Sequence, residues 1–474
     1  DYKVTECTAP CQRHCPAEID IPEYIRRISK GDYLGAVRVI REKNPFPLIC
    51  GWICPSPCEF ECRRNLVDEP VSINALKKFV SDYEKRTGER ALPTYLPPAE
   101  GKKVAVVGGG VEGLTAAYYL RRLGHRPKIL EATEKMGGIL RYVITEDRLP
   151  REVLDWEIDG ILDIGVESET NKVMGSDFTL SSLFAEGFEM VLLTTGGWDS
   201  RQILMGKTWS GTALPGTYLL LDLLYTFSKG KKKPLGKKTV ILGGGKTAVK
   251  AANICLDNGA KEVTIVYPYS KRDAESKGVE IEESGKMKFY FSAIPVELQG
   301  DGDNLTMISI QTSDGAIEEL GLDNLVIGAG RFPEMLFVKT EEEGNKWKTV
   351  EIINVLKEES GIGIFSIGET GRANDLTGVV IAVRRGRKIA RALQLYASEE
   401  EIAPDDRVII DENELQNVFE ITESGPLQAH RGNIDSIMTL TETETIAQAE
   451  RCLNCGLICY KKELNREKLN AISA

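Results

Sequence analysis

The sequence has little histidine, no long apolar run and almost no cysteine in its middle. Only His14, His125 and His430 occur among 474 residues, and we interpret His125 as a structural residue. No stretch approaches the roughly 18 consecutive apolar residues that a membrane-spanning helix needs. The first residues also lack the basic and then apolar pattern of a signal peptide. These absences predict a cytoplasmic protein without a membrane span.

Basic side chains are outnumbered by acidic ones. The chain has 60 lysines and arginines against 71 aspartates and glutamates, with a net charge of −11 and a pI near 5.2. A nucleic-acid-binding surface would be basic, so this class of protein is excluded. The length allows about two to four domains. A hydrophobic content of 42% is sufficient for their cores.

The eleven cysteines lie mainly near the two ends of the chain. Seven occur between Cys7 and Cys62, three occur between Cys452 and Cys459, and Cys255 stands alone between these groups. In a large cytosolic chain, such groups indicate metal ligands rather than disulfides. A disulfide reductase would need a pair of redox cysteines beside its cofactor, so the middle of the chain argues against that class of enzyme.

A glycine-rich turn is the most specific motif in the chain. Residues 102–117 have the pattern of a buried strand, a glycine turn and a helix. Gly108, Gly110 and Gly113 match G-x-G-x-x-G, in which glycines permit a tight turn, backbone approach to a pyrophosphate, and packing of the helix on the strand. Glu131 lies eighteen positions after Gly113, where a carboxylate can accept hydrogen bonds from ribose hydroxyls. The motif predicts a dinucleotide site, and we assign it to FAD.

The cysteines near the N-terminus have a spacing typical of iron–sulfur ligands. Cys-x3-Cys-x3-Cys-Pro is followed by a predicted helix over 22–43 and then by four cysteines at four-residue intervals. Four close cysteines can bind one cubane, and proline directly after a ligand is typical of ferredoxin-like loops. Zinc is the alternative, but its sites commonly contain Cys-x2-Cys, which this segment lacks. The predicted ligands are Cys7, Cys11, Cys15, Cys50, Cys54, Cys58 and Cys62.

The residues around these cysteines resemble a known family. The matching segments are 19–22, 44–47, 50–59 and 62–64, including Asn-Pro-Phe-Pro and Cys-Arg-Arg. They resemble the N-terminal domain of the glutamate synthase small-subunit family. That family includes flavin subunits of bifurcating ferredoxin:NADP transhydrogenases and part of dihydropyrimidine dehydrogenase. The resemblance covers almost the whole chain and implies two [4Fe–4S] clusters in a helical domain that packs on a flavin domain.

One departure from the family pattern concerns the cluster ligands. Many members begin with Arg-Cys-x2-Cys, which does not precede the N-terminal cysteines here, so seven local cysteines cannot fill eight positions. The same pattern occurs at residues 451–455. It follows the capping-box spacing of Thr441 and Glu444, which predicts a helix through Glu450. We therefore expect Cys452 and Cys455 to serve as ligands, with a non-cysteine group as the alternative.

Further flavin contacts are implied by the resemblance. Residues 136–142 resemble the second flavin-contact motif of two-dinucleotide oxidoreductases, and residues 363–370 resemble the family's closing strand, with glutamate in place of aspartate. A helix starting at residue 377 is expected to direct its N-terminus to the isoalloxazine edge, where its dipole favours an anionic reduced flavin. The implied residues are Gly137, Gly138, Arg141, Gly368, Glu369, Thr377, Gly378 and Val379.

A second glycine turn at residues 243–248 repeats the first, with alanine in place of the third glycine. In the family this unit binds NAD(P)H, whose nicotinamide lies against the flavin. Members usually carry two arginines, suited to a 2′-phosphate, where Pro268 and Tyr269 stand here. Lys271 and Arg272 are near enough to substitute, and loss of nicotinamide binding is the alternative. The expected contacts are Gly243, Gly245, Lys246, Thr247, Lys271 and Arg272.

These patterns predict an α/β protein with two Rossmann-like dinucleotide-binding domains, preceded by an α-helical iron–sulfur domain. The predicted domains are 1–99 for two clusters, 100–220 with 345–398 for FAD, 221–344 for NAD(P), and a cysteine-containing tail, 399–474.

The predicted function is that of an iron–sulfur flavoprotein oxidoreductase subunit of an anaerobic, multi-subunit complex. It would move electrons between NAD(P)H, FAD and two [4Fe–4S] clusters, to or from a partner redox subunit such as a ferredoxin-like or NADH-oxidising flavin subunit. Flavin carries hydride and one-electron chemistry, so no catalytic acid–base pair is required of the protein. The alternative is an electron-wiring scaffold subunit that keeps FAD and clusters but has lost NAD(P)H binding.

Overall fold

The computed structural model describes most of the chain and divides it into two compact units. The described residues are 8–142, 144–196, 216–228, 235–243, 246–276, 279, 281, 285–328, 335–340, 345–350, 377–398 and 440–455. The first unit comprises residues 1–95, 146–160 and 379–474, and the second comprises 96–145 and 161–378.

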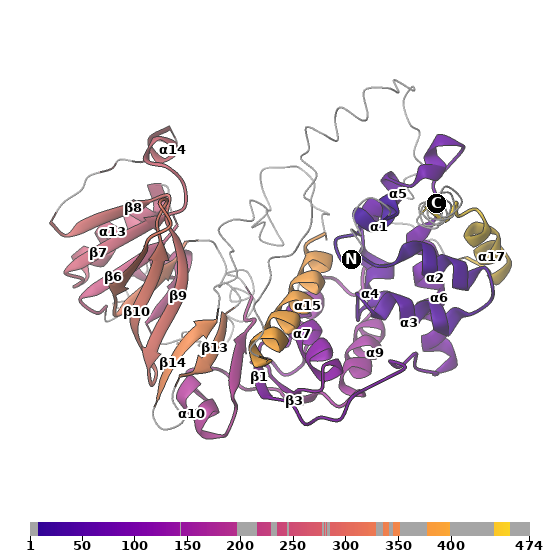
Figure 1. Cartoon of the computed structure of the whole chain (residues 1–474), viewed down its shortest axis with the longest axis horizontal. Helices are drawn as coiled ribbons and strands as arrows, with labels where there is room; N and C mark the ends of the chain where they lie inside the picture. Colours follow the sequence, from indigo (N-terminus) through magenta and orange to yellow (C-terminus); the bar gives the residue numbers. More distant parts are fainter. Residues whose placement is uncertain are drawn as a thin grey trace, which may run out of the picture. The chain divides into compact units, whose positions relative to one another are not determined.

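The first unit is helical in its described part, as Figure 1 shows. Helices α2, α3, α4 and α6 pack around a core in which Ile25, Ile40, Leu48 and Leu76 are fully buried. Each such side chain contributes about 1.5–3 kcal/mol relative to exposure in water. The bounds are α1 (Pro10–Arg13), α2 (Ile21–Ile28), α3 (Tyr33–Arg41), α4 (Pro47–Ile53), α5 (Pro57–Phe60), the 3-10 helix η1 (Arg63–Leu66), α6 (Ile73–Thr87), α9 (Arg151–Leu162), α15 (Thr377–Ala397) and α17 (Glu442–Glu450).

The helical segment predicted over 22–43 consists of two helices, α2 and α3, with a turn between them. Gly31 adopts a positive φ of 74°, which ends the first helical segment at low cost. Asp32 then accepts a hydrogen bond from the Gly35 N–H group (3.0 Å) and caps α3. The two short helices that result pack against each other in place of one long rod.

A backbone N–H group at the N-terminus of α6 is capped by a residue from outside the helix. Ser72 occupies the N-cap position, but its side chain makes no capping hydrogen bond. Instead, the Glu59 carboxylate accepts from the Asn74 N–H group at 2.8 Å. A carboxylate at a helix N-terminus also interacts favourably with the helix dipole. This bond ties α5, which carries Cys58, to α6.

A buried ionic cluster joins α3, α6 and α9. Arg41 donates from Nη2 to Glu84 at 2.9 Å, and the same nitrogen lies 3.6 Å from a Glu157 oxygen. The side chains of both glutamates are fully shielded from solvent. Burial, reinforced by the neighbouring Glu84 carboxylate and opposed by Arg41, raises the pKa of Glu157 to about 8. One guanidinium therefore faces two carboxyl groups, of which Glu157 retains its proton near neutral pH.

Replacing Glu157 by glutamine is expected to flatten the pH dependence of stability. The unfolded Glu157 ionises near its ordinary pKa of 4.5, whereas the folded one binds its proton up to about 8. The unfolded state therefore binds fewer protons between these values, so the free energy of unfolding falls as pH rises from about 5 to about 8. Glutamine does not titrate, and the fall should shrink by at least about 1 kcal/mol.

Thermal and urea unfolding at several pH values would measure this difference. Glu152→Gln, at an exposed position on the same helix, is the matched control and should follow the wild type. Equal pH slopes for wild type and Glu157→Gln would contradict the assignment of a raised pKa.

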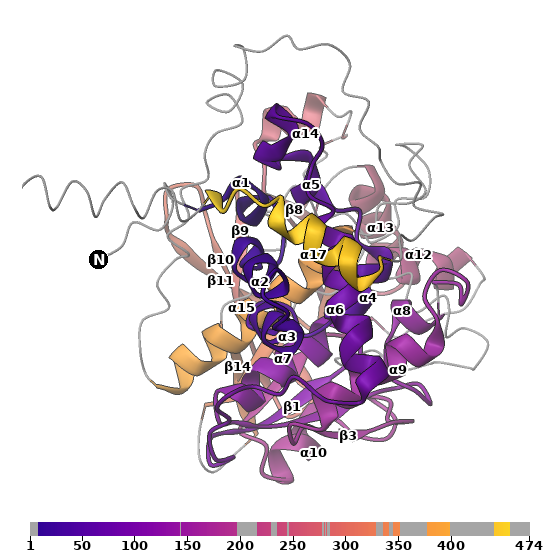
Figure 2. The same cartoon turned by 90° about the vertical axis from the view of Figure 1, so that its right-hand side faces the viewer.

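The C-terminal helix α17 docks on the N-terminal helices of the same unit, packing against α2 and α6 (Figure 2). The predicted capping box is confirmed, since Thr441 and Glu444 exchange hydrogen bonds and the helix ends at Glu450. Tyr33 donates to Glu442 at 2.8 Å. Arg451 donates to the Glu69 carbonyl at 2.7 Å and to Asp68 at 3.1 Å. These contacts connect segments almost 400 positions apart.

The second unit contains two sheets. In the first, β3, β2, β1 and β4 are parallel and adjacent in that order, which is the order of a Rossmann half. Antiparallel strands β13, β14, β9, β10 and β11 extend the same sheet. The bounds are β1 (Lys103–Val107), β2 (Arg126–Leu130), β3 (Glu167–Glu169), β4 (Met190–Leu193), β9 (Ile294–Asp301), β10 (Asn304–Gln311), β11 (Ile317–Gly321), β13 (Met335–Lys339), β14 (Lys346–Val350), α7 (Val111–Arg122), α8 (Ile139–Tyr142) and α10 (Leu180–Ala185).

The second sheet is parallel throughout and repeats this order, with strands β8, β7, β6, β12 and β5. Helix α13 packs on β6 and β7 as α7 packs on β1 and β2. The bounds are β5 (Thr217–Leu219), β6 (Lys238–Leu242), β7 (Glu262–Tyr267), β8 (Met287–Phe291), β12 (Asn324–Ile327), α12 (Leu220–Ser228), α13 (Lys246–Asp257) and α14 (Lys271–Ser276). The predicted pair of Rossmann-like folds is therefore present.

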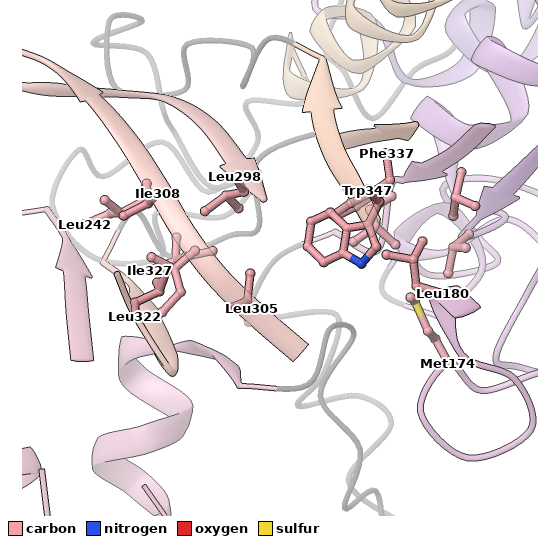
Figure 3. Packing of buried hydrophobic residues seen from close by; sticks show 14 of the residues in the cluster. Met174, Leu180, Leu242, Leu298, Leu305, Ile308, Leu322, Ile327, Phe337 and Trp347 are labelled. Atoms are coloured by element: carbon pink, nitrogen blue, oxygen red, sulfur yellow. The ribbon is translucent and has the colours of Figure 1, made fainter. Parts of the chain in front are cut away.

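One apolar cluster extends through both sheets of this unit (Figure 3). At one end, Trp347 packs edge-on against Phe337 with ring centroids 5.0 Å apart, and its indole N–H donates to the Gly302 carbonyl at 2.8 Å. A Cβ on Gly300 would lie 2.1 Å from the indole ring, so only glycine fits there. At the other end, Leu242 and Ile327 belong to the second sheet.

His125, interpreted as structural, is buried in this unit and follows the turn after α7. Its Nδ1 accepts a hydrogen bond from the Lys102 N–H group at 3.1 Å. The bond holds the residue next to β1, and its interpretation as a structural residue stays a prediction.

Candidate functional site

Four cysteines line a pocket in the helical unit, which we call the inner pocket. Cys50 belongs to α4, Cys54 directly follows that helix, Cys58 belongs to α5 and Cys15 follows α1. Prolines begin α4 and α5, where their missing N–H groups cost nothing, so that two very short helices can bracket the pocket. The inner pocket is thus lined by cysteines from three separate segments, which lie after α1, in and directly after α4, and in α5.

A second set of four cysteines lines another pocket, the outer pocket. Cys11 lies in α1 and Cys62 directly precedes η1, whereas Cys452 and Cys455 follow α17. All four are half-buried, while Cys15, Cys50 and Cys58 of the inner pocket are buried. The docking of α17 and Arg451 on the N-terminal helices explains how residues so far apart in sequence meet.

Burial makes the thiols of Cys11, Cys50, Cys54, Cys58 and Cys452 harder to ionise on their own, because it raises their pKa. Burial, with further contributions from Cys452, Cys62 and Cys455, raises the pKa of Cys11 to about 12. Burial likewise raises the pKa of Cys50 to about 12. A bound metal cation reverses this situation, because coordination deprotonates a thiol outright. Four thiols around one cavity are therefore a suitable donor set for an iron–sulfur cluster.

Among the described residues, no three His, Cys, Asp or Glu side chains form a group that could hold a single metal ion. The two cysteine sets instead surround cavities. Two further cysteines lie outside the described residues, namely the predicted ligand Cys7 and also Cys459.

The first glycine turn has the geometry of a dinucleotide cradle. Gly108 has a φ of +113°, and a Cβ there would lie 2.4 Å from the Thr194 carbonyl oxygen. A Cβ on Gly113 would lie 2.0 Å from the Gly108 carbonyl oxygen, so the helix α7 can approach the turn only with glycine. Gly110 differs, because a Cβ there would meet no protein atom within 4 Å. The space beside Gly110 is where a pyrophosphate would approach the backbone.

Glu131, predicted to bind ribose, makes hydrogen bonds that the sequence does not reveal. One oxygen accepts from the Gly109 N–H group at 2.6 Å, and the other accepts from the backbone and hydroxyl of Thr133 at 2.8 and 2.7 Å. The carboxylate is buried and braces the glycine turn. An acid at the end of the second strand was the available signal, but its partner within the turn depends on the tertiary structure.

The second predicted flavin motif lies against the first. Gly137 donates its N–H to the Gly109 carbonyl at 2.8 Å, and a Cβ on Gly138 would lie 3.2 Å from the Gly110 Cα. Both glycines adopt positive φ angles, 123° and 48°. Arg141 donates from Nε to the Met136 carbonyl at 2.6 Å. The structure therefore brings the two glycine motifs together around the space next to Gly110.

The remaining predicted flavin residues are only partly described. Gly368 and Glu369 lie outside the described residues. Helix α15 begins at Thr377, as predicted, and Val379 in its first turn is buried. The next residue, Val380, lines the inner pocket.

The first glycine of the second turn, Gly243, lies in the same left-handed backbone region as Gly108. Gly243 has a φ of +118°, and its N–H donates to the Val266 carbonyl at 3.0 Å. Gly245 lies outside the described residues, Lys246 begins α13, and Thr247 is exposed. At the end of β7, Tyr269 packs against Tyr267 with ring centroids 5.5 Å apart.

Lys271 and Arg272 follow at the start of α14 with exposed side chains. The structure thus places both cations a few residues beyond β7, on the nucleotide-binding edge of a parallel sheet.

Comparison with known proteins agrees with this architecture. Residues 3–89 match the family model described as dihydropyrimidine dehydrogenase domain II, 4Fe-4S cluster. Residues 102–386 match the model described as pyridine nucleotide-disulphide oxidoreductase.

Within the part of the chain that the structure describes, no helix has the length and apolar character needed to cross a membrane.

Several curated proteins are similar over most of the chain. A beta subunit of NADPH-Fe(3+) oxidoreductase from Geobacter sulfurreducens is 29% identical over 95% of this chain and 76% of its own length. A beta subunit of NADP(+)-dependent formate dehydrogenase from Moorella thermoacetica is 30% identical over 84% of this chain and 61% of its own. The small chain of glutamate synthase [NADPH] from Azospirillum brasilense is 28% identical, with 85% and 89% covered.

These similarities confirm the predicted resemblance to glutamate synthase small chains, the predicted order of an iron–sulfur domain followed by dinucleotide-binding folds, and the predicted class of oxidoreductase. Because the second model matches more than half of the chain, the chain belongs to the pyridine nucleotide-disulphide oxidoreductase family, with an iron–sulfur domain at its N-terminal end.

Proposed function

We propose that the chain is an iron–sulfur flavoprotein subunit that passes electrons between NAD(P)H and a partner redox protein, through FAD and two [4Fe–4S] clusters. The observation that carries this proposal is the division of eight described cysteines into two pockets of four. The clusters would be held by Cys15, Cys50, Cys54 and Cys58 and by Cys11, Cys62, Cys452 and Cys455. Cys7 is not required for either set.

The proposed order of electron transfer is based on the residues that line the pockets and on the solvent exposure of the cysteines. Val380 of α15 lines the inner pocket and directly follows the predicted flavin contacts 377–379. Ile21 and Ile73 line both pockets, so the inner and outer pockets are neighbours. The outer pocket has the more exposed cysteines. This arrangement supports a route between the inner and the outer pocket, and from the outer pocket to a partner at the surface.

The protein's own residues bind and orient the cofactors. FAD supplies both hydride and one-electron chemistry when bound, which is why a single site can connect a two-electron donor to one-electron carriers. Gly110 and Gly138 leave room for its pyrophosphate, and the N-terminus of α7 offers unpaired N–H groups to the phosphates. Glu131 holds the turn through Gly109 and has acceptor capacity left for ribose hydroxyls.

Nicotinamide binding is supported by the positive φ of Gly243 and by the parallel sheet around β6. Pro268 and Tyr269, at the end of β7, favour the second candidate function, a wiring subunit without a nicotinamide site. Relatives whose printed names include NADPH or NADP(+) support the first. The partner would be another subunit of an oxidoreductase complex, as the names of these relatives imply for them.

Anaerobic reduction followed optically tests the proposal. The purified chain with its FAD and iron content measured would be titrated with NADPH and with NADH. Bleaching of the flavin by either donor, followed by cluster reduction, is expected. Absence of flavin bleaching with both donors would exclude nicotinamide-linked activity and leave the wiring function, and absence of iron would exclude both.

Double replacement of Lys271 and Arg272 by alanine is expected to raise the KM for NADPH about tenfold and to leave the KM for NADH unchanged. The two cations are the available partners for a 2′-phosphate near β7, and hydrogen bonds to charged groups are the stronger ones. Initial rates with a dye acceptor would measure both constants. Lys261→Ala, an exposed lysine at the other end of β7, is the matched control. An equal effect on both donors would contradict a role in 2′-phosphate recognition.

A further inference from the structure

Lys77 places a buried cation in the wall of the inner pocket. It belongs to α6, its residue exposure is 7%, and it lines the cavity together with the four cysteines. Burial of an ammonium group is costly unless negative charge compensates it. Among the charged and titratable groups around Lys77, Cys54, Cys50, Cys58 and Cys15 make the largest electrostatic contributions. The compensating charge is therefore expected from the pocket itself.

Glu59, which directly follows Cys58 in the sequence, already accepts a hydrogen bond from another part of the helical unit. Glu59 interacts electrostatically with Lys77, but its carboxylate accepts the Asn74 N–H group at 2.8 Å and caps α6. The neighbouring Lys78 is equally buried yet differs in its surroundings. Its ammonium binds Asp82 at 2.5 Å and lies 4.7 Å from the centroid of Trp52. Lys78 has its counter-charge within α6, whereas Lys77 faces thiols.

A second polar side chain in the inner pocket, that of Asn44, would also favour the reduced state of a cluster. The side chain of Asn44 is fully buried and lines the cavity together with Cys50, and its Nδ2 has no hydrogen-bond partner among the described residues. Its Oδ1 accepts the Phe46 N–H group at 3.0 Å, which fixes the amide. Hydrogen bonds to cluster sulfurs and positive charge in the surroundings both raise the potential of an iron–sulfur cluster.

The outer pocket has a different electrostatic character. The cations among its described lining residues are Arg63, which is exposed, and Arg64, whose Nε binds Asp68 at 2.6 Å. Exposed charges are screened by water and a paired charge is neutralised locally. A buried cation facing the cysteines is therefore a property of the inner pocket.

We propose that the positive charge of Lys77 raises the reduction potential of the cluster held by Cys15, Cys50, Cys54 and Cys58. This inference rests on the proposed function, because it requires a cluster in the inner pocket. The added electron makes the pocket more negative, and a fixed positive charge in a poorly solvated site favours that state strongly. The inner pocket would then retain an electron until the outer pocket and its partner can accept one.

The test uses the full chain with Cys452→Ser and Cys455→Ser, so that the inner pocket holds the remaining cluster. Lys77→Met keeps the length of the side chain but removes its charge, and Lys77→Arg keeps the charge. Lys78→Met is the matched control on the same helix. Redox titration followed by electron paramagnetic resonance gives the midpoint potential of each variant, independently of activity.

We expect Lys77→Met to reduce the equilibrium constant for cluster reduction at least about tenfold, which corresponds to about 59 mV for a one-electron couple. Lys77→Arg should remain close to the parent, as should Lys78→Met. A midpoint potential unchanged in Lys77→Met, or shifted equally in Lys78→Met, would overturn the inference. If Lys77→Met fails to retain iron, a Lys77→Arg variant with a strongly shifted potential would overturn it as well. A parent protein without any cluster would instead refute the proposed function.

Discussion

Replacing both Cys452 and Cys455 by serine is expected to remove about half of the iron bound by the full chain, because each four-cysteine pocket would hold one cubane. These two residues form half of the outer pocket, with Cys11 and Cys62 as the other half. Serine is a poor ligand for iron–sulfur clusters, and two remaining cysteines cannot hold a cubane. The inner pocket shares no cysteine with the outer one. Its cluster should therefore survive.

Iron and acid-labile sulfide analysis would measure the loss, and electron paramagnetic resonance of the reduced protein would show the surviving signal. Cys255→Ser, in α13 of the other unit, is the control and should leave the iron content unchanged. The reciprocal double variant, Cys15→Ser with Cys50→Ser, should leave the outer pocket's signal. Full iron content and unaltered spectra in the Cys452→Ser, Cys455→Ser protein would contradict the assignment of the C-terminal cysteines as ligands.

The second large effect is expected at the first glycine turn, where two substitutions to alanine should act differently. Gly110→Ala should leave the apoprotein folded, because its Cβ meets no protein atom within 4 Å, but should weaken FAD binding. The methyl group would occupy the space of the pyrophosphate. Overpacking typically costs about 1–3 kcal/mol, equivalent to about 10- to 100-fold in affinity.

Gly113→Ala should destabilise the protein itself. Its Cβ would lie 2.0 Å from the Gly108 carbonyl oxygen and 2.6 Å from Thr194 Oγ1, so α7 must move away from the turn. Flavin fluorescence titration and thermal unfolding of the apoproteins would separate the two effects. Equal flavin affinity in Gly110→Ala and the wild type would show that the space beside Gly110 is not the cofactor's.

Several features of the site could be predicted from residue spacing because they depend on local backbone geometry. The G-x-G-x-x-G turn requires glycine at Gly108 and Gly113 for reasons of φ and close packing that act within one strand–turn–helix unit. The capping box of Thr441 and Glu444 is likewise confined to one helical turn. Such motifs adopt the same local structure in different proteins.

Other features were not predictable because they depend on distant segments. The cap of α6 comes from Glu59, fourteen positions before the helix begins, rather than from Ser72. Glu131 binds the Gly109 N–H group, which only the folded turn brings within reach.

By itself, the sequence determined that this chain has two dinucleotide-binding folds and a cysteine-rich helical domain, and that cysteines near both ends are suited to iron. Spacing carries that information because strands, helices and metal-binding loops have fixed repeats. Only the tertiary structure decided which cysteines share a pocket. Cys11 and Cys15 are four residues apart, yet they line different cavities, and Cys11 instead meets Cys452 and Cys455. The reason is the docking of α17, whose contacts with Tyr33, Asp68 and Glu69 are invisible in the local sequence.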